Sequence, residues 1–245
     1  MQNVPAVGNA PDPILVGWHE TVNRVRDELT QLSYDRELFR RVDKLIQAEP
    51  RLATSGHPFL YRMRAWYTYS AIMTIRRQAD RRTDVRSLRA MLAEMITHSA
   101  LLTRHQIEAL YRSDPTAAGH LSRYPEMLDM FSAWTFVATA AKADDYIDEQ
   151  IFKGDLDQLD SVATKVKRFA NKMIAHTAKS GAEAVINLTF REIDAAIDVY
   201  HDIAIKYIGL LTGASYFDLT PTDQFDSLSI FRFAWAPERR TVSGV

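Results

Sequence analysis

Two cations and a histidine recur along one edge of a helix predicted at residues 155–180. Arg168, Lys172 and His176 follow one another at intervals of four residues, so each lies about 40° around the helix from the last. An imidazole can transfer a proton near neutral pH, and a cation can hold a developing negative charge. Taken alone, the row favours a solvated helix face whose final histidine suits the negative end of the helix. Acid–base chemistry on an anion is the alternative.

The same helix must pack against a hydrophobic core. Its apolar residues recur at steps of three and four, the period of a helix with one buried face; they are Leu159, Val162, Val166, Phe169 and Met173. The cationic row therefore lies at the margin of the core.

The composition excludes several classes of protein. The chain has 245 residues, of which 47% are apolar, with a formal net charge of −1 and no cysteine. A nearly neutral chain has no overall field that attracts nucleic acid, so any anion site must be local. The missing cysteines exclude disulfides, thiolate zinc clusters and thiol nucleophiles. Nine glycines and nine prolines are few for a chain with many strand turns, which indicates helices.

Common catalytic motifs and membrane segments are also missing from the sequence. It has no glycine-rich phosphate loop, no GxSxG elbow and no HExxH pair. No apolar run has the length of a membrane span, and the first residues lack the basic region of a signal peptide. We expect a cytoplasmic protein with no membrane partner and no cofactor.

Periodic apolar residues predict an all-α fold, a single helical bundle domain of about seven to eight helices. Ser33 is expected to separate the first two helices, while Asp84 and Thr189 are expected to cap later ones. Residues 1–13 are predicted as a disordered arm, 14–213 as the domain, and 214–245 as a tail that packs on the bundle or on a partner. The predicted helices are 14 to the break at Ser33, 34–48, 58–82, 85–102, 103–112, 126–144, 155–180 and 190–212.

The helix at 58–82 is predicted to be central and mostly buried. Its rings, with Trp66 and Tyr69 among them, could form a platform for stacking bases, but aromatics at core spacing are more typical of a core. Four arginines crowd its end, where they suit either the exposed carbonyls of the helix or a phosphate. We take these arginines as candidate RNA-binding residues: Arg76, Arg77, Arg81 and Arg82.

An acidic cluster lies before the helix at 155–180. Oxygen-rich clusters can hold a divalent cation, but this one lacks the glycine and the loop pattern of a calcium hand. We therefore predict no metal site at these residues, which are Asp144, Asp145, Asp148 and Glu149.

The string from Asn171 to His176, followed by a polar turn and the helix from Thr189 to Leu211, resembles the HEPN superfamily (higher eukaryotes and prokaryotes nucleotide-binding). The match is closest to its abortive-infection U-type, or AbiU-like, branch, in which an earlier helix also resembles the stretch from Ala71 to Leu92. The resemblance covers roughly residues 57–212. It implies a HEPN-like helical domain.

Many HEPN proteins are metal-independent RNases or toxins of toxin–antitoxin and phage-defence systems. Their signature is an arginine separated from a histidine by four to six residues, usually with a polar residue beside the arginine, at a site formed where two such helices meet in a dimer. Mapped onto this chain, the histidine is His176 and the polar residue is Asn171, while the arginine position holds Ala170. The resemblance thus implies an RNA substrate, a homodimer and an antitoxin protein as partners.

Cleavage of RNA through its own 2′-hydroxyl needs a proton carrier and a cation beside the phosphate. Without the family arginine, the cation must be Lys172, about 6 Å from His176 along the helix axis, or Arg168, about 12 Å away. Three hypotheses stay open. The chain is a metal-independent endoribonuclease, weakened by Ala170; or a non-catalytic RNA- or protein-binding dimerisation module; or a bundle that binds a small molecule or metal.

Overall fold

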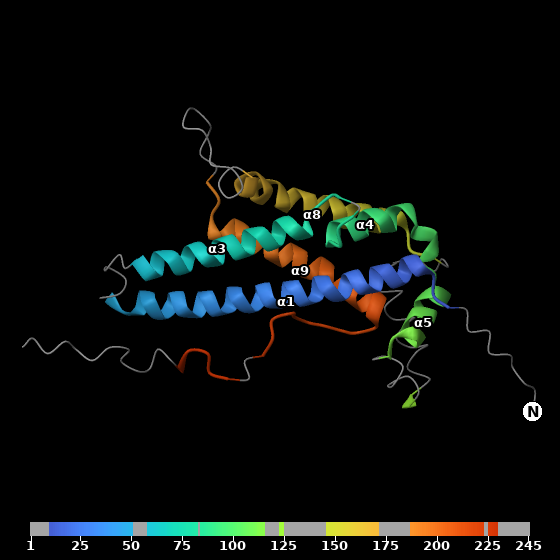
Figure 1. Ribbon diagram of the computed structural model, residues 1–245, viewed down its shortest axis with the longest axis horizontal. Helices are drawn as coiled ribbons and strands as arrows, with labels where there is room; N and C mark the ends of the chain where they lie inside the picture. Colours follow the sequence, from blue (N-terminus) through green and yellow to red (C-terminus); the bar gives the residue numbers. More distant parts are fainter. Residues whose placement is uncertain are drawn as a thin grey trace, which may run out of the picture.

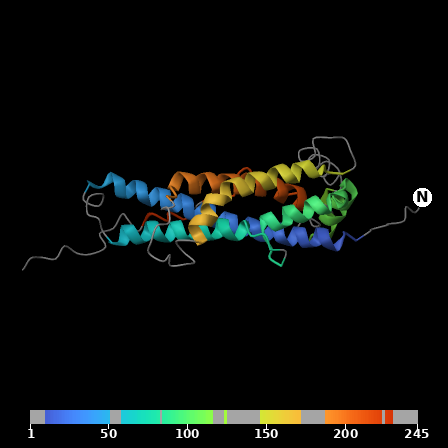
Figure 2. The same cartoon turned by 90° about the horizontal axis from the view of Figure 1, so that it is seen from above.

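Six α-helices form an elongated bundle in the computed structural model (Figures 1 and 2), which describes residues 10–50, 58–82, 84–115, 123–124, 146–171, 187–222 and 225–229. Within those ranges there is no β-strand, and only an isolated antiparallel bridge joins Thr103 to Tyr146. The predicted all-α fold is therefore confirmed.

Helix α9 (Phe190–Thr212) is the centre of the bundle. It contacts α1 (Pro13–Ala48), α3 (Pro58–Gln78), α5 (Arg104–Ser113) and α8 (Glu149–Phe169), and 11 of its 23 residues are buried. Thr189 and Glu192 form the predicted capping box at its start, and Gly213 ends it with a φ of 70°. Local sequence signals thus fix both ends of this helix.

Helix α1 is one continuous helix of 36 residues, so the predicted break at Ser33 is wrong. No proline or glycine interrupts the chain between Gly17 and Ala48, and a serine is tolerated inside a helix. Ser33 is buried in the helix. In the continuous helix Ile46 is buried, whereas Leu45 is 44% exposed.

Helix α3 buries one face and exposes the other. Tyr67 and Ala71 are buried against the bundle, but Trp66 is 60% exposed, Tyr69 49% and Met73 38%. The prediction of a mostly buried helix is therefore wrong. Helices α1, α8 and α9 pack against α3 and leave these three side chains exposed, and nothing in the apolar pattern shows how many faces of a helix its neighbours will cover.

Helix α4 (Leu88–Thr97) packs against α8 and α1 and leads through a 3₁₀ turn (Ser99–Leu101) into α5. Its cap is Ser87 instead of the predicted Asp84, since the Ser87 hydroxyl accepts the Ala90 N–H at 3.0 Å. Gln78 fixes the helix start as well, because its side-chain oxygen accepts the Leu88 N–H at 2.9 Å.

Helix α8 begins at Glu149, earlier than the predicted residue 155, because the Asp148 carboxylate accepts the Gln150 N–H at 2.9 Å and caps it. Glu149 pairs with Lys153. Of the acidic cluster, Asp148 and Glu149 thus have structural roles, and residues 144–145 lie outside the described ranges. Across the described residues no group of three histidine or acidic side chains could hold a metal ion, and no helix there is long and apolar enough to cross a membrane.

The chain after α9 runs back along α1 (Figure 1). Leu219 is buried, and its N–H donates to Nε2 of His201 at 2.8 Å. Farther on, the hydroxyls of Tyr34 and Ser227 are hydrogen-bonded at 3.0 Å. These contacts hold the described part of the tail on the bundle.

Candidate active site

The C-terminal end of α8 presents two of the predicted site residues to solvent. Arg168 and Asn171 are both exposed, while Leu159, Ala163 and Val166 on the opposite side of the helix are buried. Arg168 forms no ion pair within the described part of the chain. It is therefore available to an external anion.

Ala170, at the position of the family arginine, points into the core. Its side chain is 0% exposed, and its N–H bonds to the carbonyls of Lys167 and Val166, so the helical backbone of α8 continues to residue 171. An arginine here would place its guanidinium among apolar side chains, which is unfavourable without a partner. In this chain the position serves packing.

Lys172 and His176 lie outside the described residues, which resume at residue 187. The structure therefore places Arg168 and Asn171 together at one helix end, and it neither joins them to nor separates them from the two remaining predicted residues. What the described residues contribute is an exposed cation and an exposed amide, both able to bind phosphate oxygens.

A network around Asp160, in the middle of α8, anchors this helix to the rest of the bundle. Arg89 of α4 binds the Asp160 carboxylate with two nitrogens, at 2.9 and 2.8 Å, and Arg81 and Lys167 lie at 3.2 and 3.4 Å. Hydrogen bonds from Arg89 outweigh desolvation and lower the pKa of Asp160 to about 2. The carboxylate therefore stays ionised and joins α4, α8 and the segment after α3.

Three of the four arginines predicted to bind RNA form ion pairs with carboxylates of the same chain. Arg77 binds Glu28 at 2.8 Å, Arg81 binds Asp160, and Arg82 lies 3.4 Å from Asp80. Arg76 is half-buried and has no ion pair within the described ranges. Of this group, Arg76 is thus the residue whose charge is left for an external anion.

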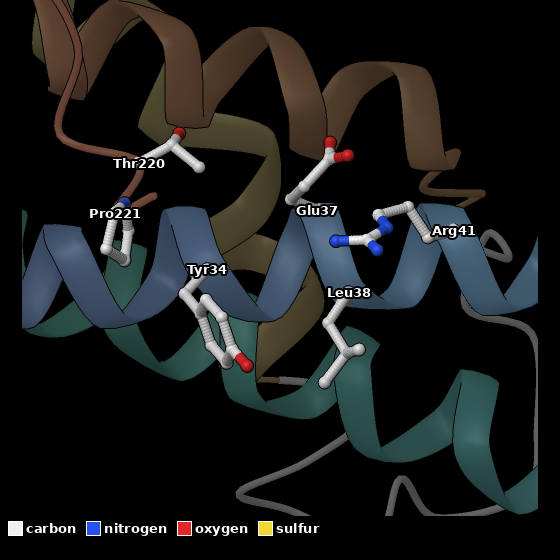
Figure 3. A pocket seen from close by; sticks show the side chains of 6 residues that line it. All are labelled: Tyr34, Glu37, Leu38, Arg41, Thr220 and Pro221. Atoms are coloured by element: carbon white, nitrogen blue, oxygen red, sulfur yellow. The ribbon is translucent and has the colours of Figure 1, made fainter. Parts of the chain in front are cut away.

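Two depressions mark the surface elsewhere. A groove of about 550 Å³ lies between α1 and α4, with Gly17, Arg86 and His98 among its lining residues. A smaller cavity of about 180 Å³ lies where Thr220 and Pro221 of the tail approach α1 (Figure 3). Neither is lined by a predicted catalytic residue.

Helix α8 ends beside the middle of α3, as both views show (Figures 1 and 2), and the two helices are in contact. The end of α8 that carries Arg168 and Asn171 therefore adjoins the helix whose exposed face carries Trp66 and Tyr69. A chain-like ligand bound at the end of α8 would therefore be close to α3 as well.

Three residues of this region are not among the predicted site residues: Arg89 and Asp160 of the network, and Arg62, which is exposed on α3. The pair Arg89–Asp160 joins residues 71 positions apart, a contact that no local pattern indicates. Arg62 had a detectable signal, since it begins a row at steps of four and three with Trp66 and Tyr69.

One comparison with known proteins gives a match. The HEPN_AbiU2 family model, described as AbiU2, matches residues 16–231, which is most of the chain. No curated protein and no solved structure matches it.

Proposed function

The chain belongs to the AbiU2 family of HEPN proteins, and from this premise we propose that it is a metal-independent endoribonuclease of the toxin or phage-defence type. Membership makes it an abortive-infection HEPN-like protein. The proposal adds the chemistry, with His176 as the proton carrier and Arg168 or Lys172 as the cation.

The observation that supports the nuclease most directly is that Arg168 is exposed and has no ion-pair partner among the described residues. This side chain is exposed at the end of α8 and forms no ion pair within the described residues, whereas its neighbours Lys165 and Lys167 bind Glu192 and Asp160. A cation without a protein partner keeps its full attraction for a phosphate. Asn171, also exposed, adds an amide donor five residues before His176.

In the proposed reaction, His176 removes the proton from a ribose 2′-hydroxyl, and that oxygen attacks the adjacent phosphorus. The bond from phosphorus to the 5′-oxygen breaks, and the leaving oxygen takes up a proton. Arg168 or Lys172 holds the negative charge that develops on the phosphate oxygens. No metal takes part, so the reaction proceeds in EDTA.

The buried Ala170 supports a second candidate function. Since the family arginine is missing and its position faces the core, the same surface suits a protein that binds RNA or another protein without cutting. Both candidates include a homodimer in which two α8 ends meet. An antitoxin protein that covers Arg168 and Asn171 fits either of them.

Incubation of the purified chain with labelled RNA in EDTA tests the first candidate. We expect cleavage that His176→Ala abolishes and that Arg168→Gln weakens by about tenfold or more, as loss of one charge-stabilising donor does in other enzymes. Lys165→Gln serves as the matched control, because Lys165 is on the same helix but already paired with Glu192. Intact RNA with retained binding would favour the non-catalytic candidate.

Sedimentation at micromolar concentration tests the homodimer. We expect a dimer, and we expect Arg168→Glu with Asn171→Asp to weaken it if the two α8 ends meet. A monomer at every concentration would remove the shared site and leave RNA binding as a property of one chain.

A further inference from the structure

The exposed face of α3 carries a regular row of aromatic and basic side chains. Arg62, Trp66, Tyr69, Met73 and Arg76 follow at steps of four, three, four and three, which places all five within about 80° of the helix circumference over about 21 Å. Trp66 is 60% exposed, Tyr69 49% and Met73 38%. We call these five residues the α3 outer row.

The charge of α3 is entirely positive. From Pro58 to Gln78 it contains four arginines and no acidic residue. Carboxylates of α1 bind two of them, since Asp43 contacts Arg64 and Glu28 contacts Arg77, each at 2.8 Å. Arg62 and Arg76 have no ion pair within the described ranges. These two belong to the outer row and stand at its two ends.

Rings and charges are thus arranged as a single strand of nucleic acid requires. Trp66 and Tyr69 are three residues apart, about 4.5 Å along the helix axis, and stacked bases repeat at about 3.4 Å. Arginines at the ends can bind the phosphates on either side of bases stacked on the rings. A duplex hides its base faces, so the rings can serve only unpaired bases.

We propose that the α3 outer row is a binding surface for single-stranded RNA. This inference rests on the proposed function, because it supplies the substrate surface for an RNA-cleaving site. It also commits to a substrate class, since RNA is held by stacking of unpaired bases. Because α8 ends beside the middle of α3 (Figures 1 and 2), the helix that carries the row is next to the helix end that carries Arg168.

Fluorescence polarisation with a labelled 2′-O-methyl oligouridylate tests the surface. This probe has no free 2′-hydroxyl, so binding is measured without cleavage. We expect Trp66→Ala and Tyr69→Ala each to weaken binding by about 5- to 150-fold, the range for loss of one stacking ring. Tyr61→Ala is the matched control, because Tyr61 is 75% exposed on the same helix but lies about 140° around from Trp66.

Salt titration distinguishes the contribution of the arginines to RNA binding from the contribution of the rings. For Arg62→Gln and Arg76→Gln, we expect the slope of log affinity against log salt concentration to fall by about 0.7, the value for one lost contact to single-strand phosphate. Trp66→Ala should leave the slope unchanged. Arg112→Gln is the charge control, because Arg112 is 59% exposed on α5, at the far end of the bundle from the row (Figure 1).

Each remaining outcome overturns the proposal. Equal affinity of wild type, Trp66→Ala and Tyr69→Ala would place RNA elsewhere on the chain, and equal affinity for a blunt duplex would exclude stacking. If Trp66→Ala turned a dimer into a monomer without weakening the probe, the row would be an interface with a second copy. The proposed nuclease is judged separately, by cleavage of unmodified RNA in EDTA, so the two ideas can fail independently.

Discussion

The position of the missing family arginine gives a sharp test of the chemistry, because two adjacent residues face opposite ways. Ala170 is 0% exposed, whereas Asn171 is exposed. Ala170→Arg restores the family pattern in sequence but puts a guanidinium into the core. Asn171→Arg puts the guanidinium in solvent. Four residues then separate this arginine from His176, which is still within the family spacing.

The structure sets the size of both effects. Overpacking a core costs about 1–3 kcal/mol, and an unpaired buried charge adds about 3–5 kcal/mol, so Ala170→Arg should lose about 4–8 kcal/mol of unfolding free energy. That is a large part of the total unfolding free energy of an ordinary domain, which is roughly 5–15 kcal/mol. Asn171→Arg is a surface change and should stay within about 0.5 kcal/mol of wild type.

Urea denaturation followed by circular dichroism measures the first effect, and RNA cleavage in EDTA measures the second. We expect Asn171→Arg to cleave at least about tenfold faster than wild type, and Ala170→Arg to unfold at lower urea without such a gain. Asn171→Gln separates the arrival of the cation from the loss of the asparagine. An Ala170→Arg variant as stable as wild type would refute the buried position, and an unchanged rate in Asn171→Arg would refute the histidine–cation mechanism.

Further predictions concern the helices that carry the site. Asp160→Asn should lower the free energy of unfolding by about 1–2 kcal/mol at pH 7, because the carboxylate binds Arg89 but is partly screened by solvent. Asp84→Asn is the control: its carboxylate is 76% exposed, and the substitution should change the free energy of unfolding by less than about 0.5 kcal/mol. Folding lowers the pKa of Asp160 from 3.8 to about 2, so its contribution to stability is complete above pH 3.8 and is lost as the pH falls towards 2. The difference in unfolding free energy between wild type and Asp160→Asn, measured in urea, should therefore shrink over that interval. A constant difference would contradict the lowered pKa. Gly154→Ala should raise the melting temperature, because a Cβ there meets nothing within 4 Å and alanine favours a helix by about 1 kcal/mol over glycine. Gly213→Ala should lower it, because φ is +70°, and equal shifts in the two alanine variants would contradict the left-handed cap. Thr189→Ala should cost about 1 kcal/mol through loss of the capping box, measured by urea denaturation, and no loss would mean that tertiary packing alone sets the start of α9.

The sequence predicts α9 well because the signals that define it are local. Thr189 and Glu192 are three residues apart and bond to each other's backbone, and Gly213 stops the helix with a conformation that suits glycine. Between them, apolar residues recur with the helical period and are buried. Nothing distant is needed to recognise such a helix.

The sequence fails where the outcome depends on distant neighbours. A serine such as Ser33 can cap a helix or lie within one, and packing of the whole of α1 decides between them. The hydrophobicity of Trp66 and Tyr69 does not show which faces of α3 other helices cover. Arg89 and Asp160 meet across 71 positions, so their network becomes visible only in the folded chain.

The exposed rings of α3 are not explained by folding alone. A buried aromatic side chain contributes about 1.5–3 kcal/mol relative to an exposed one, and Trp66 and Tyr69 gain only part of that, while Tyr67 and Ala71 already secure the helix to the bundle. Replacing either ring with a polar residue should therefore cost only about 1 kcal/mol of unfolding free energy, roughly half of the value for a fully buried ring. A loss of RNA affinity much larger than this loss of stability would then show that the rings serve binding, because a purely structural role would change both measurements together.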